Sequence, residues 1–347
     1  MHGGDIYSSK VKYDFSVNMN PLGIPRKAKS AGKKALKNAA HYPDPNCLAL
    51  RKKLSEKLGI KGEAICFGNG ASELISAFAR ASKAERALLL APSFSGYRAA
   101  LESIGAKISY YHLDEKNGFS LSGSDTVNLE SEILSGKYGI FIMASPNNPD
   151  GRLVPAEYME KIAAACGKSE TWLLIDECFM ALSGSNSSFL RKILNSKNAA
   201  VLRAFTKTFS LPGVRLGYMV SEKETGEKVR KELPEWNVSL IAQETGVACL
   251  SGEKYILRAV RLIEKERRFL SEKLSSLGFK VFPSDVNFIL FKSGKIFDLK
   301  ERLLKKKILL RDCGDYEGLE KGFYRIAVKT HRENRKLALA LKAAISG

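Results

Sequence analysis

The sequence predicts an α/β protein in two parts: a large domain built on a mostly parallel seven-stranded sheet, and a smaller α+β domain. Three observations lead to this prediction. The chain has 347 residues, which is enough for a large and a small domain that each bury their own core. Short apolar runs alternate with helical patterns between residues 64 and 220, and after Pro234 longer helical patterns take over. Alternation of the first kind is typical of a parallel sheet covered by helices on both faces.

The strands of the large domain are predicted from continuous apolar runs, which indicate strands buried on both faces. These runs are residues 64–67, 86–91, 107–111, 138–144, 172–176, 200–204 and 214–220. Helical patterns lie between most of them, including residues 71–81, 95–103, 155–166 and 189–195. Ligands of such sheets bind at the carboxyl ends of the strands, so the residues that follow each run are the first candidates for a site.

The two ends of the chain differ from its centre. The first 22 residues, rich in Gly, Asn and Pro, predict an irregular arm, and helical patterns follow at residues 26–39 and 47–58. After Pro234 the predicted elements are helices at 239–250 and 253–277, strands at 280–282, 287–291 and 323–328, and a last helix at 332–345. We therefore expect an N-terminal arm of residues 1–22, a large domain of residues 46–233, and a small domain of residues 23–45 and 234–347.

The composition narrows the class of protein. Apolar and charged fractions of 44% and 27% are ordinary for a soluble globular chain. No apolar run is long enough to cross a bilayer, and the N-terminus lacks the pattern of a signal peptide, so we expect a cytoplasmic protein without membrane contact. The six cysteines and four histidines are dispersed, whereas a metal site needs clustered ligands, so we expect no metal.

The net charge of +19 has three possible explanations. It can reflect a solvated lysine-rich surface, attraction of anionic substrates, or nucleic-acid binding. The basic residues are spread through predicted helices such as residues 26–37 and 258–273, without a basic tail or an aromatic-interleaved basic block. We therefore expect no nucleic-acid partner, and the first two explanations stay open.

The candidate for covalent chemistry is Lys207, which follows a predicted strand in the segment AFTKTFSLPGVRLG of residues 204–217. A lysine that forms a Schiff base must lose its proton readily, as a partly desolvated amine near other cations does. Arg215, eight positions further on, could hold a phosphate through a forked hydrogen bond. A solvated loop lysine explains this segment equally well, so the interpretation needs support from other segments.

Two of the supporting segments lie in the first half of the predicted sheet. Gly70, Ala71 and Ser72 join a strand to a helix whose N-terminus offers free N–H groups to a phosphate, although a tight turn also explains the glycine. Phe94 follows the next strand and could either stack on a planar ligand or belong to the core.

Two more lie further along the chain. Asn148 belongs to a proline-rich turn and could donate to a phenolate oxygen, although turn chemistry alone accounts for the amides. Asp176 ends a hydrophobic strand, and a buried carboxylate must be paired; a protonated pyridine nitrogen would be a suitable partner. Each segment alone is ambiguous, but together and in this order they indicate one site.

This ordered set resembles the fold-type I pyridoxal-phosphate enzymes, the aspartate aminotransferase superfamily, over essentially the whole chain. The resemblance implies pyridoxal 5′-phosphate as cofactor, with a Schiff base on Lys207, Asp176 at the pyridine nitrogen, and Asn148 at the O3′ oxygen. Phe94 falls on the aromatic residue that stacks on the ring. The positions of the phosphate cup are Gly70, Ala71, Ser72, Thr206 and Arg215. Tyr42, in the segment HYPDP of residues 41–45, matches a tyrosine that reaches the cofactor of a neighbouring subunit, so a homodimer with shared active sites is implied.

Within the superfamily the sequence resembles two families, histidinol-phosphate aminotransferase and L-threonine-O-3-phosphate decarboxylase. Three features favour the decarboxylase: the opening HGG at residues 2–4 followed by DFSVNMNPLG at 14–23, Phe179 where most aminotransferases have tyrosine, and RIAVKT at 325–330. The core Asn-x-Asn-Pro-Leu-Gly is shared by both families. The resemblance implies that the anionic groups of the substrate are bound by His2, Asn18, Asn20 and Arg325.

We therefore expect decarboxylation of L-threonine O-3-phosphate to (R)-1-aminopropan-2-yl phosphate, or of L-serine O-phosphate to ethanolamine phosphate, for cobamide biosynthesis. The alternative is a histidinol-phosphate aminotransferase or a related amino-acid aminotransferase. A third class, regulators that bind the same cofactor, carries a DNA-binding segment ahead of this domain, for which an arm that begins at His2 leaves no room. Three departures from the usual pattern, Asp5, Asp150 and Ala204, leave the substrate open.

Overall fold

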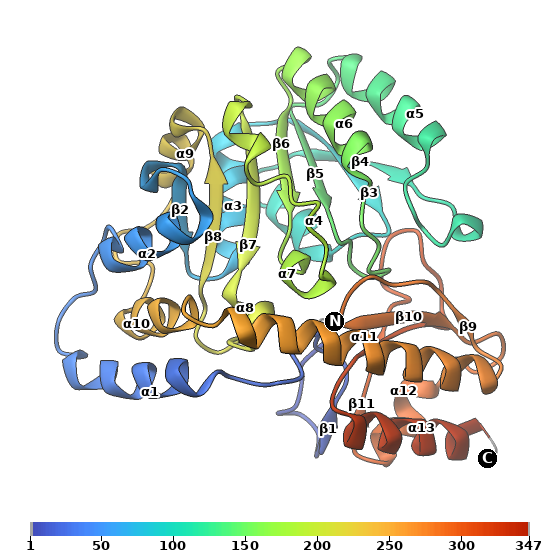
Figure 1. The fold of residues 1–347 in the computed structure, drawn as a ribbon. Coiled ribbons are helices and arrows are strands. Elements are labelled where there is room, and N and C mark those ends of the chain that lie inside the picture. Colours follow the sequence, from blue (N-terminus) through green and yellow to red (C-terminus); the bar gives the residue numbers. More distant parts are fainter. Residues whose placement is uncertain (1–2, 346–347) are drawn as a thin grey trace.

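The centre of the protein is a seven-stranded sheet with the strand order β2-β8-β7-β6-β5-β3-β4 (Figure 1). The computed structural model describes residues 3–345, apart from the side chain of Glu253. The strands are β2 (Ile65–Gly68), β3 (Arg86–Ala91), β4 (Lys107–His112), β5 (Ile140–Ala144), β6 (Trp172–Asp176), β7 (Ala199–Ala204) and β8 (Gly217–Ser221). Strand β8 runs antiparallel to both of its neighbours, β2 and β7, and all other pairs in this sheet are parallel. The predicted mostly parallel seven-stranded sheet is confirmed.

Helices cover both faces of this sheet, because its strands are apolar on both sides. On one face lie α3 (Ala71–Ser82), α4 (Ser95–Glu102) and α9 (Lys223–Arg230). On the other lie α2 (Leu48–Leu58), α5 (Gly123–Leu134), α6 (Ala156–Lys168) and α10 (Leu240–Cys249). In β6, Leu174 faces the first core while Leu173 and Ile175 face the second, as the alternation of side chains in a strand requires.

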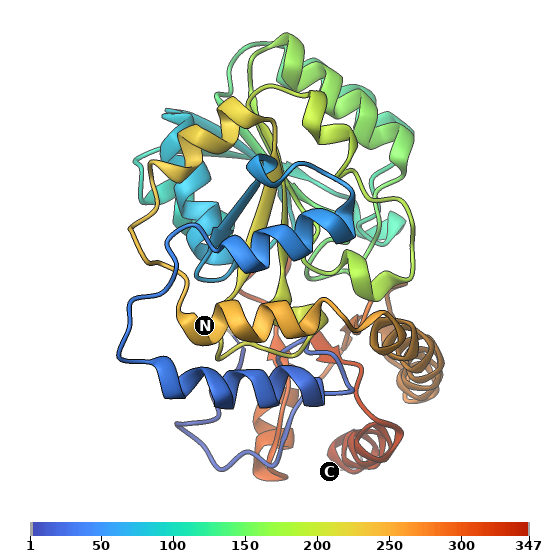
Figure 2. The same ribbon diagram turned by 60° about the vertical axis from the view of Figure 1, so that its left-hand side comes forward.

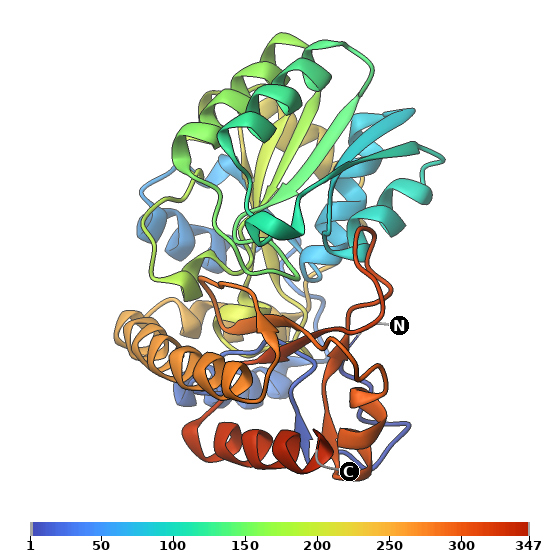
Figure 3. The ribbon, with the colours of Figure 1, turned by 90° about the vertical axis from the view of Figure 1, so that its right-hand side faces the viewer.

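A second, smaller unit lies below the carboxyl ends of the strands (Figures 1 and 3). The long helix α11 (Glu253–Ser276) runs beneath the large sheet and leads into a four-stranded antiparallel sheet of order β12-β13-β10-β9. Its strands are β9 (Lys280–Val281), β10 (Phe288–Lys292), β12 (Arg311–Asp312) and β13 (Phe323–Ala327), and the helices beside it are α12 (Leu299–Lys305) and α13 (His331–Ile345).

The N-terminal arm is tied to this smaller unit. Its strand β1 (Tyr13–Asp14) pairs in parallel with β11 (Ile308–Leu309), and Phe15 is fully buried in the core of the unit. Helix α1 (Arg26–Ala35) lies instead along α10, which also contacts α2 (Figure 2). The division into domains at residues 46 and 234 therefore stays a prediction.

Three differences from the predicted elements have simple causes. Where a helix was expected at 189–195, the chain forms only a short 3-10 turn, η4 (Lys192–Asn195). Helix α9 was not predicted because it is mostly polar and exposed, with Val229 as its main apolar contact to the core. The arm was expected to be irregular throughout, but β1 forms because the smaller unit offers it the backbone of β11.

The described residues contain no helix that is long and apolar enough to span a bilayer. Nor do His, Cys, Asp and Glu side chains gather in that part of the chain as a metal site would require. All six cysteines are buried free thiols.

Candidate active site

A cavity of about 320 Å³ lies where the carboxyl ends of the strands meet the smaller unit and the arm. Four basic side chains line it, Lys207, Arg215, Arg311 and Arg325, against one acidic side chain among the described residues, Asp176. Such an excess of positive charge in a partly closed space favours ligands that carry several negative charges.

Lys207 lies in the short helix α8 (Phe205–Thr208), which begins directly after β7. Its ammonium nitrogen Nζ is 5.8 Å from the centre of the Phe179 ring, whose apolar face helps to desolvate it. Burial, followed by repulsion from Arg325, lowers the pKa of Lys207 from 10.5 to about 8. A substantial fraction of this amine is therefore neutral near physiological pH, which is the form that reacts as a nucleophile.

Asp176 ends β6, and its carboxylate is held by two donors at the cavity wall. The Tyr97 hydroxyl donates to Oδ2 at 2.7 Å, and the backbone N–H of Cys178 donates to Oδ1 at 2.8 Å. Burial raises the pKa of Asp176, and these hydrogen bonds together with Lys207 oppose that rise. Phe94 lies beside this pair, with its ring edge-on to Tyr97 at a centroid distance of 5.5 Å.

Asn148 is oriented by residues of the smaller unit. Its Oδ1 accepts from Arg325 Nη1 and, at 3.5 Å, from the Tyr316 hydroxyl. This arrangement leaves the NH₂ end of Asn148 to donate into the cavity. Arg325 also donates from Nη2 to the Ser16 carbonyl at 2.9 Å, and its buried Nε lacks a partner in the described part of the chain.

The N-terminus of α3 forms the end of the cavity that could hold a phosphate. Ala71 and Ser72 line the cavity, no side chain caps the helix, and Thr206 and Arg215 close the same end. Gly70 does not itself line the cavity. It takes φ +85°, and a Cβ at this position would collide with the Arg215 guanidinium, so glycine is needed for the arginine to reach this helix end.

Of the four other residues expected at the site, the structure places one in the cavity and two elsewhere, and the fourth lies outside the described residues. Asn18 lines the cavity, and its buried Oδ1 has no partner among the described residues. Asn20 does not line it: Nδ2 donates to the Thr208 carbonyl at 2.8 Å and Oδ1 accepts from Leu22 N at 2.9 Å. The expected substrate contact of Asn20 is therefore not what the structure shows, because both ends of its amide hold the arm against the Lys207 segment.

Tyr42 lies outside the cavity, and His2 lies outside the described residues. Tyr42 is 79% exposed and packs on Trp236, with ring centroids 4.7 Å apart. His2 precedes the described residues, but the next residue, Gly3, lines the cavity.

Three functional candidates were missed by the sequence reasoning: Tyr97, Arg311 and Tyr316. Arg311 lies directly opposite Arg325 across β12 and β13, and Tyr316 contacts Arg325 Nη1 at 3.3 Å. Arg311 directly follows an apolar run at residues 308–310, and this was the one signal in the sequence that pointed to a functional residue there. Its place beside Arg325 follows only from the strand pairing.

The family model for class I and II aminotransferases matches residues 10–341. The chain belongs to this family. The adenosylcobalamin biosynthesis bifunctional protein of Leptospira interrogans is 34% identical over 97% of this chain, which spans only 40% of that longer protein. A putative threonine-phosphate decarboxylase of Caldanaerobacter subterraneus is 33% identical over 98% of this chain and 93% of its own length.

Among solved structures, the histidinol-phosphate aminotransferase of Clostridium acetobutylicum superposes with a TM-score of 0.88 at 32% identity, over 96% of this chain and 99% of that one. The protein is a fold-type I enzyme of the class I and II aminotransferase family, and its cofactor is pyridoxal 5′-phosphate. The cavity fits this cofactor, because it combines an uncapped helix end with an arginine, a buried carboxylate and a lysine of lowered pKa.

Proposed function

We propose that this protein decarboxylates L-threonine O-3-phosphate, or L-serine O-phosphate, in cobamide biosynthesis. The observation that carries the proposal is the presence of two separate groups of anion-binding residues in one cavity. The helix end of α3 and Arg215 suit the phosphate of the cofactor. Arg311 and Arg325, opposite each other on β12 and β13, are left for a second phosphate.

The residues that would hold pyridoxal phosphate follow from this geometry. The N–H groups of Ala71 and Ser72, with Thr206 and Arg215, would bind its phosphate. Asp176 would pair with its ring nitrogen, the NH₂ of Asn148 would donate to O3′, and Phe94 would cover one face of the ring. Lys207 would hold it covalently. When bound, the cofactor supplies a ring that accepts the electron pair released at the substrate's α-carbon.

The chain's own residues would decide which bond at the α-carbon breaks. With the cofactor bound, the residues that hold the substrate would select the bond that they keep perpendicular to the ring, because only that bond could pass its electrons to the cofactor. If Arg311, Arg325 and Asn18 hold the phosphate, the α-carboxylate is free of these arginines and can take that perpendicular position, from which it leaves as CO₂. The Lys207 amine, with a pKa of about 8, is suited to return a proton to the α-carbon.

Two features of the cavity support decarboxylation rather than amino transfer. Phe179 packs on Phe288 and offers no hydroxyl beside Lys207, where most aminotransferases have a tyrosine. Gly3 of the opening HGG packs closely on Ser16 of the same arm beside the cavity: a Cβ there would be 2.6 Å from the Ser16 carbonyl oxygen, so the motif has a structural reason for glycine at this position. The relative that is 33% identical over most of both chains carries the decarboxylase name.

The alternative is an aminotransferase that acts on histidinol phosphate or a related substrate. The high similarity to the Clostridium acetobutylicum structure favours this alternative. The arginine pair would also hold the phosphate of histidinol phosphate. We propose a homodimer for either reaction, in which the exposed Tyr42 reaches the partner's cofactor; the exposed Leu36 and Leu48 nearby, 58% and 62% accessible, support such an interface.

The test is to incubate the holoenzyme with L-threonine phosphate and to measure CO₂ and aminopropanol phosphate. Release of both supports the proposal. Transamination of histidinol phosphate with 2-oxoglutarate, without CO₂ from threonine phosphate, contradicts it and establishes the alternative. Specific DNA binding without turnover of either substrate would instead support a regulator.

A further inference from the structure

The two arginines of the smaller unit lie directly opposite each other, but their surroundings differ. Both are buried, with 7% and 6% of their surface exposed, and both line the cavity. Like charges opposite each other across two strands repel, so this pair needs negative charge nearby. The structure supplies that charge to only one of the two.

Arg325 is fixed by uncharged groups. Its guanidinium donates to the amide oxygen of Asn148, to the Tyr316 hydroxyl at 3.3 Å and to the Ser16 carbonyl at 2.9 Å. In the described part of the chain it has no carboxylate partner, so its positive charge is available to a ligand.

Arg311 is already paired. Its Nη2 donates to Asp315 Oδ1 at 2.6 Å, and its guanidinium lies 5.1 Å from the centre of the Tyr316 ring. Asp315 does not line the cavity, and its side chain is 43% exposed, against 8% for Arg311. An anion that enters the cavity therefore meets an arginine that is neutralised by a carboxylate outside the cavity.

We propose that Asp315 is a specificity-determining residue that makes the arginine pair select a phosphate dianion over a carboxylate. This inference rests on the proposed function, in which the substrate carries both groups. A ligand carboxylate has the same charge as Asp315, which the chain holds beside Arg311 at high effective concentration, so exchange of one for the other gains little.

A phosphate monoester competes with Asp315 for Arg311 more strongly than a carboxylate does. It carries nearly two negative charges and three acceptor oxygens, so its attraction to Arg311 is about twice that of a carboxylate at the same distance. It can also span both arginines, whereas one carboxylate satisfies only the unpaired Arg325. Asp315 thus weakens the binding of any anion to Arg311, and it weakens the binding of a carboxylate more than that of a phosphate. The discrimination arises from a residue that opposes the carboxylate ligand.

The loop that carries Asp315 is held by contacts other than this ion pair. Its backbone bonds run from Cys313 N to the Phe323 carbonyl at 2.8 Å and from Tyr316 N to the Cys313 carbonyl at 3.1 Å, and Tyr316 is buried. Further along, Glu317 contacts His112 of β4 at 3.3 Å, where the loop reaches the large sheet (Figure 3). Replacement of Asp315 should therefore leave the loop folded.

The experiment measures the binding of propyl phosphate and butyrate to the holoenzyme by titration calorimetry. Neither probe has an amine, so no reaction follows binding. In the wild type, propyl phosphate should bind at least about tenfold more tightly. In Asp315→Asn, butyrate should gain about tenfold in affinity and propyl phosphate less than about threefold, so that the ratio falls.

The matched control is Asp312→Asn, which removes the same charge from the same segment. The Asp312 carboxylate accepts from Gly314 N at 2.9 Å, whereas the Arg311 guanidinium pairs with Asp315, so replacement of Asp312 should leave the ratio unchanged. In Arg311→Gln the ratio should fall as well, and adding Asp315→Asn should change it less than the same substitution does in the wild type, because the two residues are coupled.

Two results would overturn the inference. One is a wild type without preference for propyl phosphate. The other is an unchanged ratio in Asp315→Asn, which includes an equal loss of both affinities and indicates a merely structural role. These outcomes do not depend on the reaction. If threonine phosphate releases no CO₂ but the ratio still falls in Asp315→Asn, the proposed function fails and the role of Asp315 stands.

Discussion

Replacement of the buried Asp150 by asparagine should alter the stability of the protein more favourably at high pH than at low pH. Asp150 is fully buried in the turn between β5 and α6, where it accepts from the Asn147 amide and, at 2.8 Å, from Arg152 N. Burial raises its pKa from 3.8 to about 7 in spite of these donors. In the unfolded chain the carboxyl returns to its ordinary pKa, so the two states bind the proton differently.

The sign and size of the change in folding stability with pH follow from this difference in proton binding. The folded pKa is raised, so the folded state keeps a proton between about pH 4 and about pH 7 that the unfolded state has lost. Stability is therefore fully present below about pH 4, falls as the pH rises, and levels off above about pH 7. About three pKa units at about 1.4 kcal/mol each give a total loss of about 4 kcal/mol. Asp150→Asn avoids this loss, and its amide oxygen still accepts from Arg152 N. Its NH₂ group replaces the oxygen that accepts from the Asn147 amide, which costs a hydrogen bond at every pH and leaves the pH dependence unchanged.

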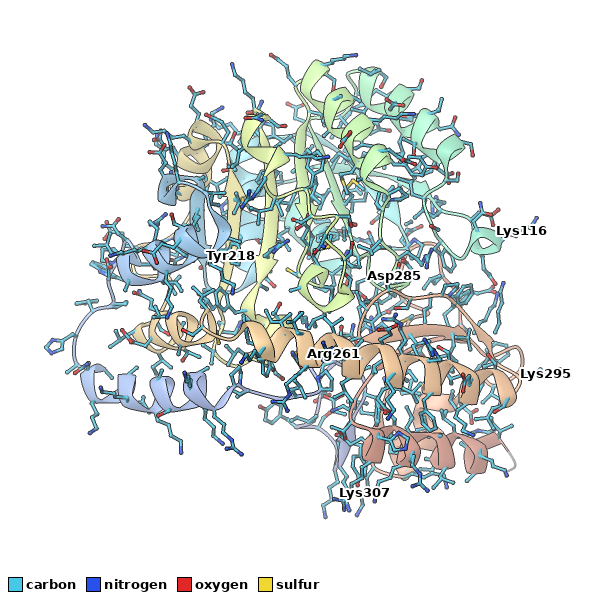
Figure 4. All side chains as sticks on the ribbon, in the orientation of Figure 1. Lys116, Tyr218, Arg261, Asp285, Lys295 and Lys307 are labelled. Carbon is cyan, nitrogen blue, oxygen red and sulfur yellow. The ribbon has the colours of Figure 1, made fainter. Side chains whose placement is uncertain are left out.

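The assay compares thermal unfolding of the cofactor-free wild type and Asp150→Asn at pH 5 and pH 8. The advantage of the variant should grow by about 3 kcal/mol between these pH values, which is a shift of several degrees in Tm. The control is Asp285→Asn on the other side of the same turn, where the carboxylate is 32% exposed and accepts from Leu153 N at 3.0 Å (Figure 4). The control should gain no stability, because its carboxylate is partly exposed and paired with Arg152. A Tm difference for Asp150→Asn that is the same at both pH values refutes the reasoning.

Three further substitutions and one pH profile test the cofactor site. Lys207→Ala should abolish the visible absorbance of the bound cofactor, and an unchanged spectrum would show that another residue holds it. Because the pKa of Lys207 is lowered to about 8, the rate of cofactor uptake by the cofactor-free enzyme should rise with pH and level off above about pH 8, as stopped-flow absorbance can show. Tyr97→Phe removes a donor to Asp176 and should weaken cofactor affinity about tenfold in equilibrium dialysis, with little change in folding. Gly70→Ala should displace Arg215 and weaken the same affinity by at least about tenfold, whereas normal affinity would place the phosphate elsewhere.

The sheet was predictable because its strands are buried on both faces, except for the partly exposed edge strand β4. Such strands read as continuous apolar runs, as in β6, and all seven runs became strands of one sheet with small shifts at their ends. Helix α9 escaped prediction because its buried face carries only one large apolar side chain, Val229, beside Thr225 and Gly226. The segment at residues 189–195 resembled a helix, but it forms only a short 3-10 turn beside β7.

Part of the site was predictable for a related reason. The carboxyl ends of parallel strands meet at one edge, so Phe94, Asn148, Asp176 and Lys207 had to lie close together once the strands were assigned. The arm gave a mixed result, because its two asparagines look alike in sequence. Only the fold shows that Asn18 lines the cavity, whereas both ends of the Asn20 amide form hydrogen bonds that hold the arm.

By itself, the sequence determined the sheet, the edge at which ligands bind and the residue types that meet there, because apolar runs and the residues that follow them are local properties of the chain. The tertiary structure decided which charges face one another. Arg311 and Arg325 are 14 positions apart in sequence and become neighbours through the register of β12 and β13, and Asp315 neutralises only one of them. The pKa values of Lys207 and Asp150 likewise depend on burial by residues from distant segments. Electrostatic energy depends on distance and solvent exposure, and neither quantity exists until the chain has folded.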